Sequence, residues 1–89
     1  MQSAEQWLAS QTFHHSQFTD VAALVARKER LGLRLSLCIP TLNEAATIGA
    51  VVKRLRPLRD AAGLLDEIVV MDSGSGDRTL AQAAAAGAD

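Results

Sequence analysis

The chain has 89 residues, of which 48% are hydrophobic and 21% are charged, and its formal net charge is −1 at pH 7. This length allows one small domain at most, and the composition is that of a globular protein rather than a disordered or fibrous one. The near-neutral charge excludes the polybasic surface that nucleic acids and anionic membranes attract, so we expect neither as a partner.

The sequence also argues against secretion and membrane insertion. Its N-terminal residues lack the pattern of a signal peptide, and no apolar run approaches the roughly 20 residues that span a bilayer. The single cysteine, Cys38, cannot form a disulfide within the chain. These features predict a cytoplasmic protein without a membrane segment.

Residues 1–32 are expected to form a helical N-terminal preface. Trp7 and Leu8 mark a first short helix. Asp20 is well placed to N-cap a second helix, and Gly32 to end it in the left-handed conformation that glycine favours. We therefore expect two helices before any strand.

The next elements alternate between strand and helix periodicity. Residues 33–39 alternate apolar and polar side chains, which predicts a strand that Pro40 ends. Residues 45–56 place apolar side chains at helical spacing, which predicts an amphipathic helix that Pro57 stops. The apolar run at 67–71 predicts a second strand, covered on both faces as in a parallel sheet.

A polar loop, Asp72–Asp77, follows the second strand, and an alanine-rich helix follows the loop. Asp77 is the expected N-cap of this helix, and Gly87 the expected end. Strand, helix, strand and helix in this order predict a parallel pair with a right-handed crossover. A parallel sheet of only two strands has little with which to cover both of its faces. We therefore expect residues 33–89 to be the truncated N-terminal part of a larger α/β domain.

In an open parallel sheet, ligands bind at the carboxyl ends of the strands. Two loops occupy those ends, Pro40–Glu44 and Asp72–Asp77, and both hold more polar groups than a turn requires. Neither loop is a P-loop, and Gly74-Ser75-Gly76 lacks the third glycine of a dinucleotide fingerprint because Thr79 stands in its place. We therefore expect these two loops to bind a ligand without a P-loop and without the dinucleotide-binding fingerprint.

The stretches IPTLNEAATIG and IVVMDSGSGDRT resemble two signatures of nucleotide-sugar-dependent glycosyltransferases of the Rossmann-like GT-A fold, P-x-x-N-E and V-D-D-G-S-x-D-x-T. Together with a tryptophan near the start of the preface, they are most similar to glucosyl-3-phosphoglycerate synthases. This resemblance implies transfer of glucose from UDP-glucose to 3-phosphoglycerate, a divalent metal (Mg²⁺ or Mn²⁺) and a homodimer. The alternatives are another GT-A enzyme, such as a polyprenyl-phosphate sugar transferase, or a non-catalytic nucleotide-binding fragment.

The resemblance implies six nucleotide-binding residues in the two loops: Pro40, Thr41, Leu42, Glu44, Asp72 and Ser73. Ser73 matches the residue that meets the uracil from the second loop. Thr41 stands where the family often has alanine, and Gly76 where threonine is usual. No catalytic or metal-binding residue is expected in this chain, because the D-x-D motif that holds the metal should lie further along.

Spacing alone also permits structural roles for these residues. Thr41 to Glu44 matches a capping box, in which Glu44 folds back on the N-cap, and Asn43 is another candidate cap. The presence of both motifs favours Glu44 as a carboxylate that accepts hydrogen bonds from ribose hydroxyls. Asp72 is left open between ordering its own loop and contacting the nucleotide, whereas Asp77 is favoured as a cap.

Overall fold

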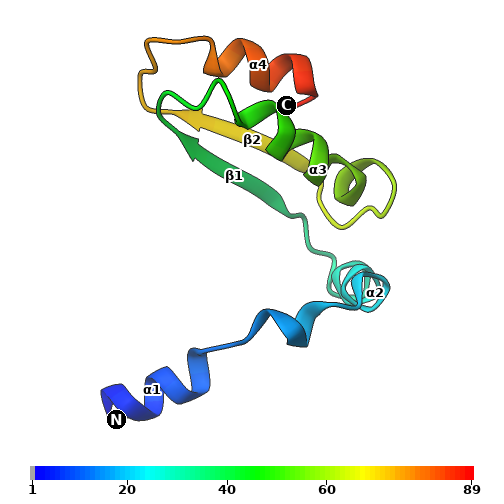
Figure 1. The fold of residues 1–89 in the computed structure, drawn as a ribbon. Helices are drawn as coiled ribbons and strands as arrows, with labels where there is room; N and C mark the ends of the chain where they lie inside the picture. Colours follow the sequence, from blue (N-terminus) through cyan, green and yellow to red (C-terminus); the bar gives the residue numbers. More distant parts are fainter. Residues whose placement is uncertain (1) are drawn as a thin grey trace.

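A computed structural model describes residues 2–89. The N-terminal residues form three short helices: α1 (Ala4–Gln11), the 3-10 helix η1 (His15–Phe18) and α2 (Val21–Leu31). A βαβα unit follows, made of β1 (Ser36–Thr41), α3 (Ile48–Asp60), β2 (Glu67–Asp72) and α4 (Thr79–Ala86). Figure 1 shows the first part as an extended arm that leads into this unit.

Helix α1 forms from local signals alone. The Ser3 hydroxyl accepts a hydrogen bond from Gln6 N, and the Gln6 side chain accepts one from Ser3 N, which makes a capping box. Trp7 and Leu8 lie in this helix as predicted, but each is 55% exposed and α1 buries no residue. Capping therefore defines α1, and packing does not.

Helix α2 begins and ends where the sequence predicts. The Asp20 carboxylate accepts a hydrogen bond from Ala23 N at 3.0 Å, and Gly32 ends the helix with φ +65°. Lys28 then connects α2 to the βαβα unit, because its ammonium contacts the Asp66 carboxylate at 2.8 Å and the Gly63 carbonyl at 3.1 Å. This contact lies beside the amino end of β2.

Strands β1 and β2 pair in parallel, with Ser36 opposite Glu67 and Thr41 opposite Asp72. The first strand therefore begins later than predicted and continues through Pro40, which was expected to end it. Just before the strand, Leu35 N donates to the Asp66 side chain at 2.7 Å and the Leu35 carbonyl accepts from Asp66 N at 2.8 Å, and the regular register begins at Ser36. Pro40 is tolerated because the neighbouring bond from Ser73 N to the Thr41 carbonyl places the missing N–H of Pro40 on the side of β1 that faces away from β2.

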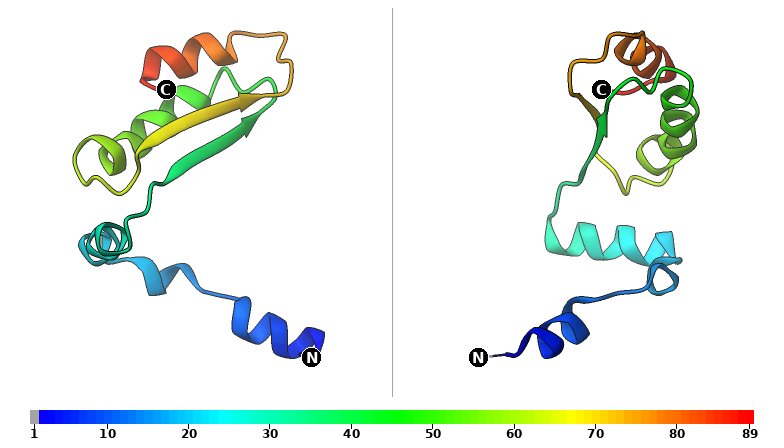
Figure 2. Two further views of the ribbon diagram at one scale, coloured as in Figure 1. Left: turned by 180° about the vertical axis from the view of Figure 1, so that it is seen from behind. Right: turned by 60° about the vertical axis from the view of Figure 1, so that its left-hand side comes forward.

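The core lies between the sheet and two helices. Ile48 and Val52 of α3 pack with Ala83 and Ala86 of α4, and side chains from both strands contact this cluster. Figure 2 shows α3 and α4 on the same face of the sheet. Within residues 2–89 both helices cover one face of β2, and Met71 on this strand is 58% exposed.

Helix α3 differs from its predicted span at both ends. It starts at Ile48 rather than at residue 45, because Thr47 N and Ile48 N both turn back to the Glu44 carbonyl. It also continues past Pro57, which was expected to stop it, to Asp60. The Pro57 carbonyl accepts hydrogen bonds from two N–H groups after the helix, so the turn that contains proline still closes.

Helix α4 begins at Thr79, one residue later than an N-cap at Asp77 predicts. Its N-cap position is Arg78, not Asp77. The Asp77 carboxylate nevertheless accepts a hydrogen bond from Thr79 N at 3.0 Å, so it satisfies an N–H of the first turn. Gly87 ends the helix as predicted, with φ +107°.

Candidate nucleotide-binding site

The two predicted loops lie side by side at the carboxyl ends of the strands. Thr41 and Asp72 are the last residues of β1 and β2, and they face each other in the register. The ladder continues one step further, because Ser73 N donates to the Thr41 carbonyl at 2.9 Å. The fold therefore brings together residues that are 32 positions apart in the sequence, and Figure 1 shows both loops beyond the arrowheads.

The first loop presents most of its predicted residues to solvent. Pro40 and Glu44 are exposed, and the Leu42 side chain is 56% exposed. Thr41 differs, because it is only 5% exposed and its hydroxyl donates to Asp72 Oδ1 at 2.8 Å. The Thr41 side chain is therefore engaged between the two strand ends.

Glu44 does not form the capping box that its spacing permits. Its Oε2 accepts a hydrogen bond from the Thr47 hydroxyl at 3.1 Å, and its backbone carbonyl receives the first N–H groups of α3. The N-cap of α3 is Thr47, which makes no side-chain capping bond. The exposed Glu44 carboxylate has one other oxygen with acceptor capacity left for a ligand.

Asp72 orders the second loop from within. Its carboxylate accepts hydrogen bonds from Ser75 N at 2.7 Å, the Ser75 hydroxyl at 2.5 Å and the Thr41 hydroxyl. The Ser75 hydroxyl, followed by the Ser75 N–H, holds the pKa of the Asp72 carboxyl below its usual range. The geometry thus favours loop ordering for Asp72, the first of its two predicted roles.

Unlike the Asp72 carboxylate, the Ser73 side chain is not engaged by its neighbours in the described part of the chain. Its side chain is exposed, and within residues 2–89 its hydroxyl makes no hydrogen bond. Its backbone is fixed by the bond to the Thr41 carbonyl. Ser73 therefore holds an unengaged donor and acceptor at a defined place between the loops.

Three consecutive N–H groups at the end of the first loop and just after it donate to side chains of the second loop and of the first residue of α4. Asn43 N donates to Ser75 Oγ at 2.8 Å, Glu44 N to Thr79 Oγ1 at 2.9 Å, and Ala45 N to an Asp77 oxygen at 3.3 Å. In return, Gly76 N donates to Asn43 Oδ1 at 2.9 Å, so that Asn43 both gives and receives a bond across the loops.

The sequence motifs do not single out Ser75 or Thr79 as site residues, and their spacing indicates Asn43 only as a candidate cap. Asn43 has φ +54°, which is the left-handed region that asparagine tolerates better than most residues. Thr79 is completely buried, and its hydroxyl also donates to Asp77. An asparagine after a strand was the available signal, but its partners across the loops could not be read from spacing.

A small hollow of about 140 Å³ lies beside the first loop, between the end of β1 and the start of α3. Its lining includes three of the predicted residues, Pro40, Thr41 and Glu44. A complete small-molecule site occupies about 300–1,000 Å³, so this hollow holds only part of a nucleotide. The rest of a nucleotide site must be formed by other surfaces.

The residues present do not fit a metal ion. In the part of the chain that the structure describes, no three His, Cys, Asp or Glu side chains come together as a metal-ligand group. The two aspartates nearest the loops, Asp72 and Asp77, already accept hydrogen bonds from neighbouring N–H and hydroxyl groups. They are therefore loop-ordering groups.

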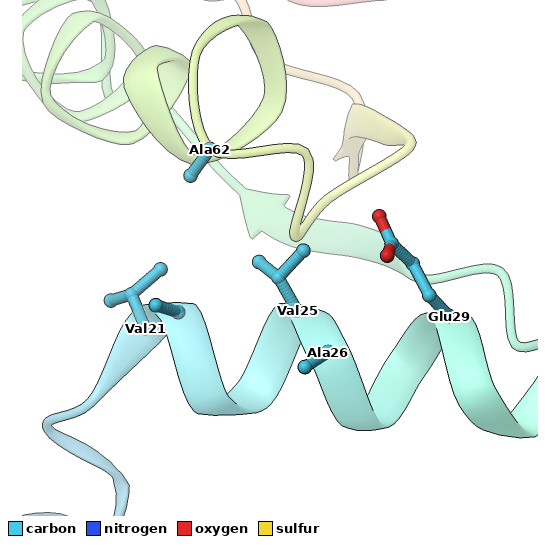
Figure 3. Close-up of a pocket in the computed structure, with 6 residues that line it drawn as sticks. Val21, Val25, Ala26, Glu29 and Ala62 are labelled. Carbon is cyan, nitrogen blue, oxygen red and sulfur yellow. The ribbon is translucent and has the colours of Figure 1, made fainter.

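A second hollow, of about 370 Å³, lies at the other end of the unit, between α2 and Ala62 (Figure 3). Apart from Glu29, its lining consists of alanine and valine side chains. Apart from the Glu29 carboxylate it lacks hydrogen-bonding side chains, and it does not adjoin the carboxyl ends of the strands.

No helix within residues 2–89 is both long enough and apolar enough to cross a membrane.

The sequence is similar to that of known glycosyltransferases. A family model described as glycosyl transferase family 2 matches residues 36–88. The glucosyl-3-phosphoglycerate synthase of Petrotoga mobilis is 42% identical over 82 residues, and that of Mycolicibacterium smegmatis is 44% identical over 82 residues. The matches cover 91% and 92% of this chain but 25% of each relative, so the chain spans a quarter of the length of these proteins.

Solved structures confirm the predicted α/β GT-A fold, including the helical preface. The mannosyl-3-phosphoglycerate synthase of Rubrobacter xylanophilus superposes with a TM-score of 0.82 at 36% identity, covering 98% of this chain and 28% of that one. The Mycobacterium tuberculosis glucosyl-3-phosphoglycerate synthase in complex with Mn²⁺, UDP and glucosyl-3-phosphoglycerate gives 0.71 at 43% identity, covering 86% and 26%. Since the family match takes in more than half of the chain, the chain belongs to glycosyl transferase family 2.

Proposed function

We propose that the protein containing this chain is a glycosyltransferase that transfers glucose from UDP-glucose to 3-phosphoglycerate. We propose further that the chain supplies part of the UDP-binding site. One observation carries the second proposal: the Ser73 hydroxyl is unengaged and is held one step beyond the ladder, beside Pro40–Leu42. The names of the most similar relatives support the reaction.

Each loop offers groups that match one part of uridine. Uracil presents an N–H donor and two carbonyl acceptors, which backbone groups of residues 40–42 and the Ser73 hydroxyl can pair. Leu42 adds exposed apolar surface for a face of the base. The exposed Glu44 carboxylate, which lines the same hollow as Pro40 and Thr41, accepts hydrogen bonds from the ribose hydroxyls.

Asp72 contributes to the same site through its loop. Its carboxylate is engaged by Ser75 and Thr41, so we propose that it shapes the nucleotide-binding surface rather than pairing with the base. The resemblance also implies Mg²⁺ or Mn²⁺ on a D-x-D motif outside this chain, which would neutralise the diphosphate. The phosphorylated acceptor would bind to residues outside this chain, and the resemblance implies a homodimer, which light scattering of the intact protein tests.

We propose a division of the chain at residues 32 and 33. Residues 33–89 would belong to the nucleotide-sugar-binding domain, because the family match begins at residue 36 and the core residues all follow it. Residues 1–32 would be a separate helical preface, joined to the domain through Lys28.

The test is calorimetric titration of the intact protein with UDP-glucose and GDP-mannose in Mg²⁺ or Mn²⁺. Glu44→Ala is expected to weaken UDP-glucose binding by about 10- to 100-fold, since it removes a charge-assisted hydrogen bond. Ser73→Ala is expected to weaken it by about 2- to 10-fold. Arg54→Ala, on the exposed face of α3, is the matched control.

Turnover identifies the reaction itself. With UDP-glucose and 3-phosphoglycerate, mass spectrometry should detect a glucosyl-phosphoglycerate product. A protein that binds GDP-mannose and not UDP-glucose would support mannosyl transfer, a second candidate favoured by the Rubrobacter structure. Lack of binding to any uridine nucleotide would remove the site assignment.

A further inference from the structure

Beyond the sheet, five hydrogen bonds join residues 41–45 to the second loop and the start of α4. Past the bond between Ser73 N and the Thr41 carbonyl, every hydrogen bond described between the loops involves a side chain. In the first loop, two residues use their own side chains for this purpose: Thr41 at the strand end, whose hydroxyl donates to Asp72, and Asn43 in the turn itself, whose Oδ1 accepts from Gly76 N. We propose that Asn43 is a positioning residue that fixes the spacing of the two nucleotide-binding loops.

The backbone conformation at Asn43 is part of the argument. Residues 41 to 45 must leave β1 and turn so that three successive N–H groups face the second loop. Asn43 makes this turn with φ +54°, the only positive φ among the described non-glycine residues. Asparagine adopts this region at low cost, whereas alanine does not.

The hydrogen bonds at Asn43 form a closed circuit with the second loop. Ser75 Oγ accepts from Asn43 N and donates to the Asp72 carboxylate, while Asn43 Oδ1 accepts from Gly76 N. Asp72 also accepts from the Thr41 hydroxyl, which returns to the first loop. The circuit encloses the stretch where Ser73 sits, so it sets how far the Ser73 hydroxyl lies from Pro40 and Leu42.

This inference rests on the proposed uridine site, and it makes a distinct prediction. Asn43 need not touch the nucleotide. Its loss should leave the contacting groups in place but let the two loops move independently, which weakens binding of a ligand that spans both. A residue with a purely structural role would lower stability without changing the affinity of the folded protein.

Three variants of Asn43 separate the conformation from the side-chain bond. Asn43→Asp keeps an acceptor and tolerates the left-handed region, Asn43→Gly keeps the conformation but removes the acceptor, and Asn43→Ala removes both. Uridine is the titrant, because it carries no charge that the new carboxylate of Asn43→Asp could repel. We expect affinity near wild type for Asn43→Asp, about 2- to 10-fold weaker for Asn43→Gly, and weaker again for Asn43→Ala.

A double variant tests whether Asn43 and Ser75 act as one unit. Ser75→Ala removes the oxygen that accepts from Asn43 N and donates to Asp72. If the circuit is the cause, Asn43→Gly combined with Ser75→Ala should bind uridine little worse than the weaker single variant. Additive losses would instead mean independent contacts and would overturn the proposal.

A measurement without ligand keeps this result separate from the proposed function. Amide hydrogen exchange at Gly76 and Ser75 in the intact protein should be faster in Asn43→Gly than in wild type, and unchanged in Asn43→Asp. Unchanged exchange in Asn43→Gly overturns the positioning role whether or not uridine binds. Faster exchange together with no uridine binding by the wild-type protein supports the connection between the loops and rejects the proposed nucleotide site.

Discussion

In the arm formed by residues 2–32 only Lys28 is buried, whereas the βαβα unit buries five apolar side chains. The helices α1 and α2 of the arm have side-chain N-caps at Ser3 and Asp20, whereas the N-cap residues of α3 and α4 make no side-chain capping bond. In the arm, Phe13 and Phe18 contact each other edge to face but remain 63% and 49% exposed. Capping and turn signals are thus enough to define a helix locally, as in the arm. A site with fixed geometry needs strands and helices that a buried core holds in place, as in the βαβα unit.

The largest expected difference concerns the core itself. Ile68→Ala, at a residue with 0% exposure, should lower the free energy of unfolding by about 2–5 kcal/mol. Trp7→Ala, at a 55% exposed residue of the arm, should change it by less than about 0.5 kcal/mol. Urea denaturation of the intact protein, followed by circular dichroism, measures both. Equal effects would mean that the arm has a packing partner of comparable importance.

The two glycines that end α2 and α4 provide a matched pair of smaller effects. At Gly32 an added Cβ would meet nothing within 4 Å, so Gly32→Ala should cost only the left-handed strain of about 1–2 kcal/mol. At Gly87, with φ +107°, it would also lie 3.0 Å from Arg56 Cδ. Gly87→Ala should therefore destabilise the protein more than Gly32→Ala in the same urea titrations, and the reverse order would contradict the packing described for α4.

The smallest effect concerns the junction between the two regions, and it depends on pH. Lys28, followed by the Leu35 N–H, holds the pKa of the Asp66 carboxyl below its ordinary value of 3.8. A depressed carboxyl pKa stabilises the folded state above the unfolded value and ceases to do so as the pH falls through the folded value. The stability difference between wild type and Asp66→Asn should thus be constant near neutrality and shrink below about pH 3.8. A difference that grows in acid would refute this role for Asp66.

Local signals in the sequence predicted much of the fold correctly. Asp20, Gly32 and Gly87 act where they were expected to, because each acts within one helical turn. Pro40 and Pro57 were misjudged for different reasons. Pro40 lies on β1 where its missing N–H points away from β2, so no bond of the ladder is lost. Pro57 lies inside α3 and gives up one helix hydrogen bond, but the helix continues for one more turn because the Pro57 carbonyl accepts from Ala61 N and Ala62 N.

The sequence predicted where the candidate site lies, but not the hydrogen bonds that join its two loops. The two motifs placed Pro40–Glu44 and Asp72–Ser73 at neighbouring strand ends, and the parallel register does bring Thr41 opposite Asp72. The bonds from Asn43 to Ser75 and from Glu44 to Thr79 join residues more than 30 positions apart. Such partners depend on the exact register and loop path, which spacing within a single motif does not determine.

The central claim is that both loops bind one uridine nucleotide. The most direct test is to titrate UDP with Mg²⁺ into the isotope-labelled intact protein and to follow the backbone amides of Leu42 and Ser73 by NMR. If one nucleotide contacts both loops, both signals should shift and saturate with the same dissociation constant, while the amide signal of Ala26, beside the other hollow, should not shift. Shifts confined to one loop, or to Ala26 and its neighbours, would contradict the claim.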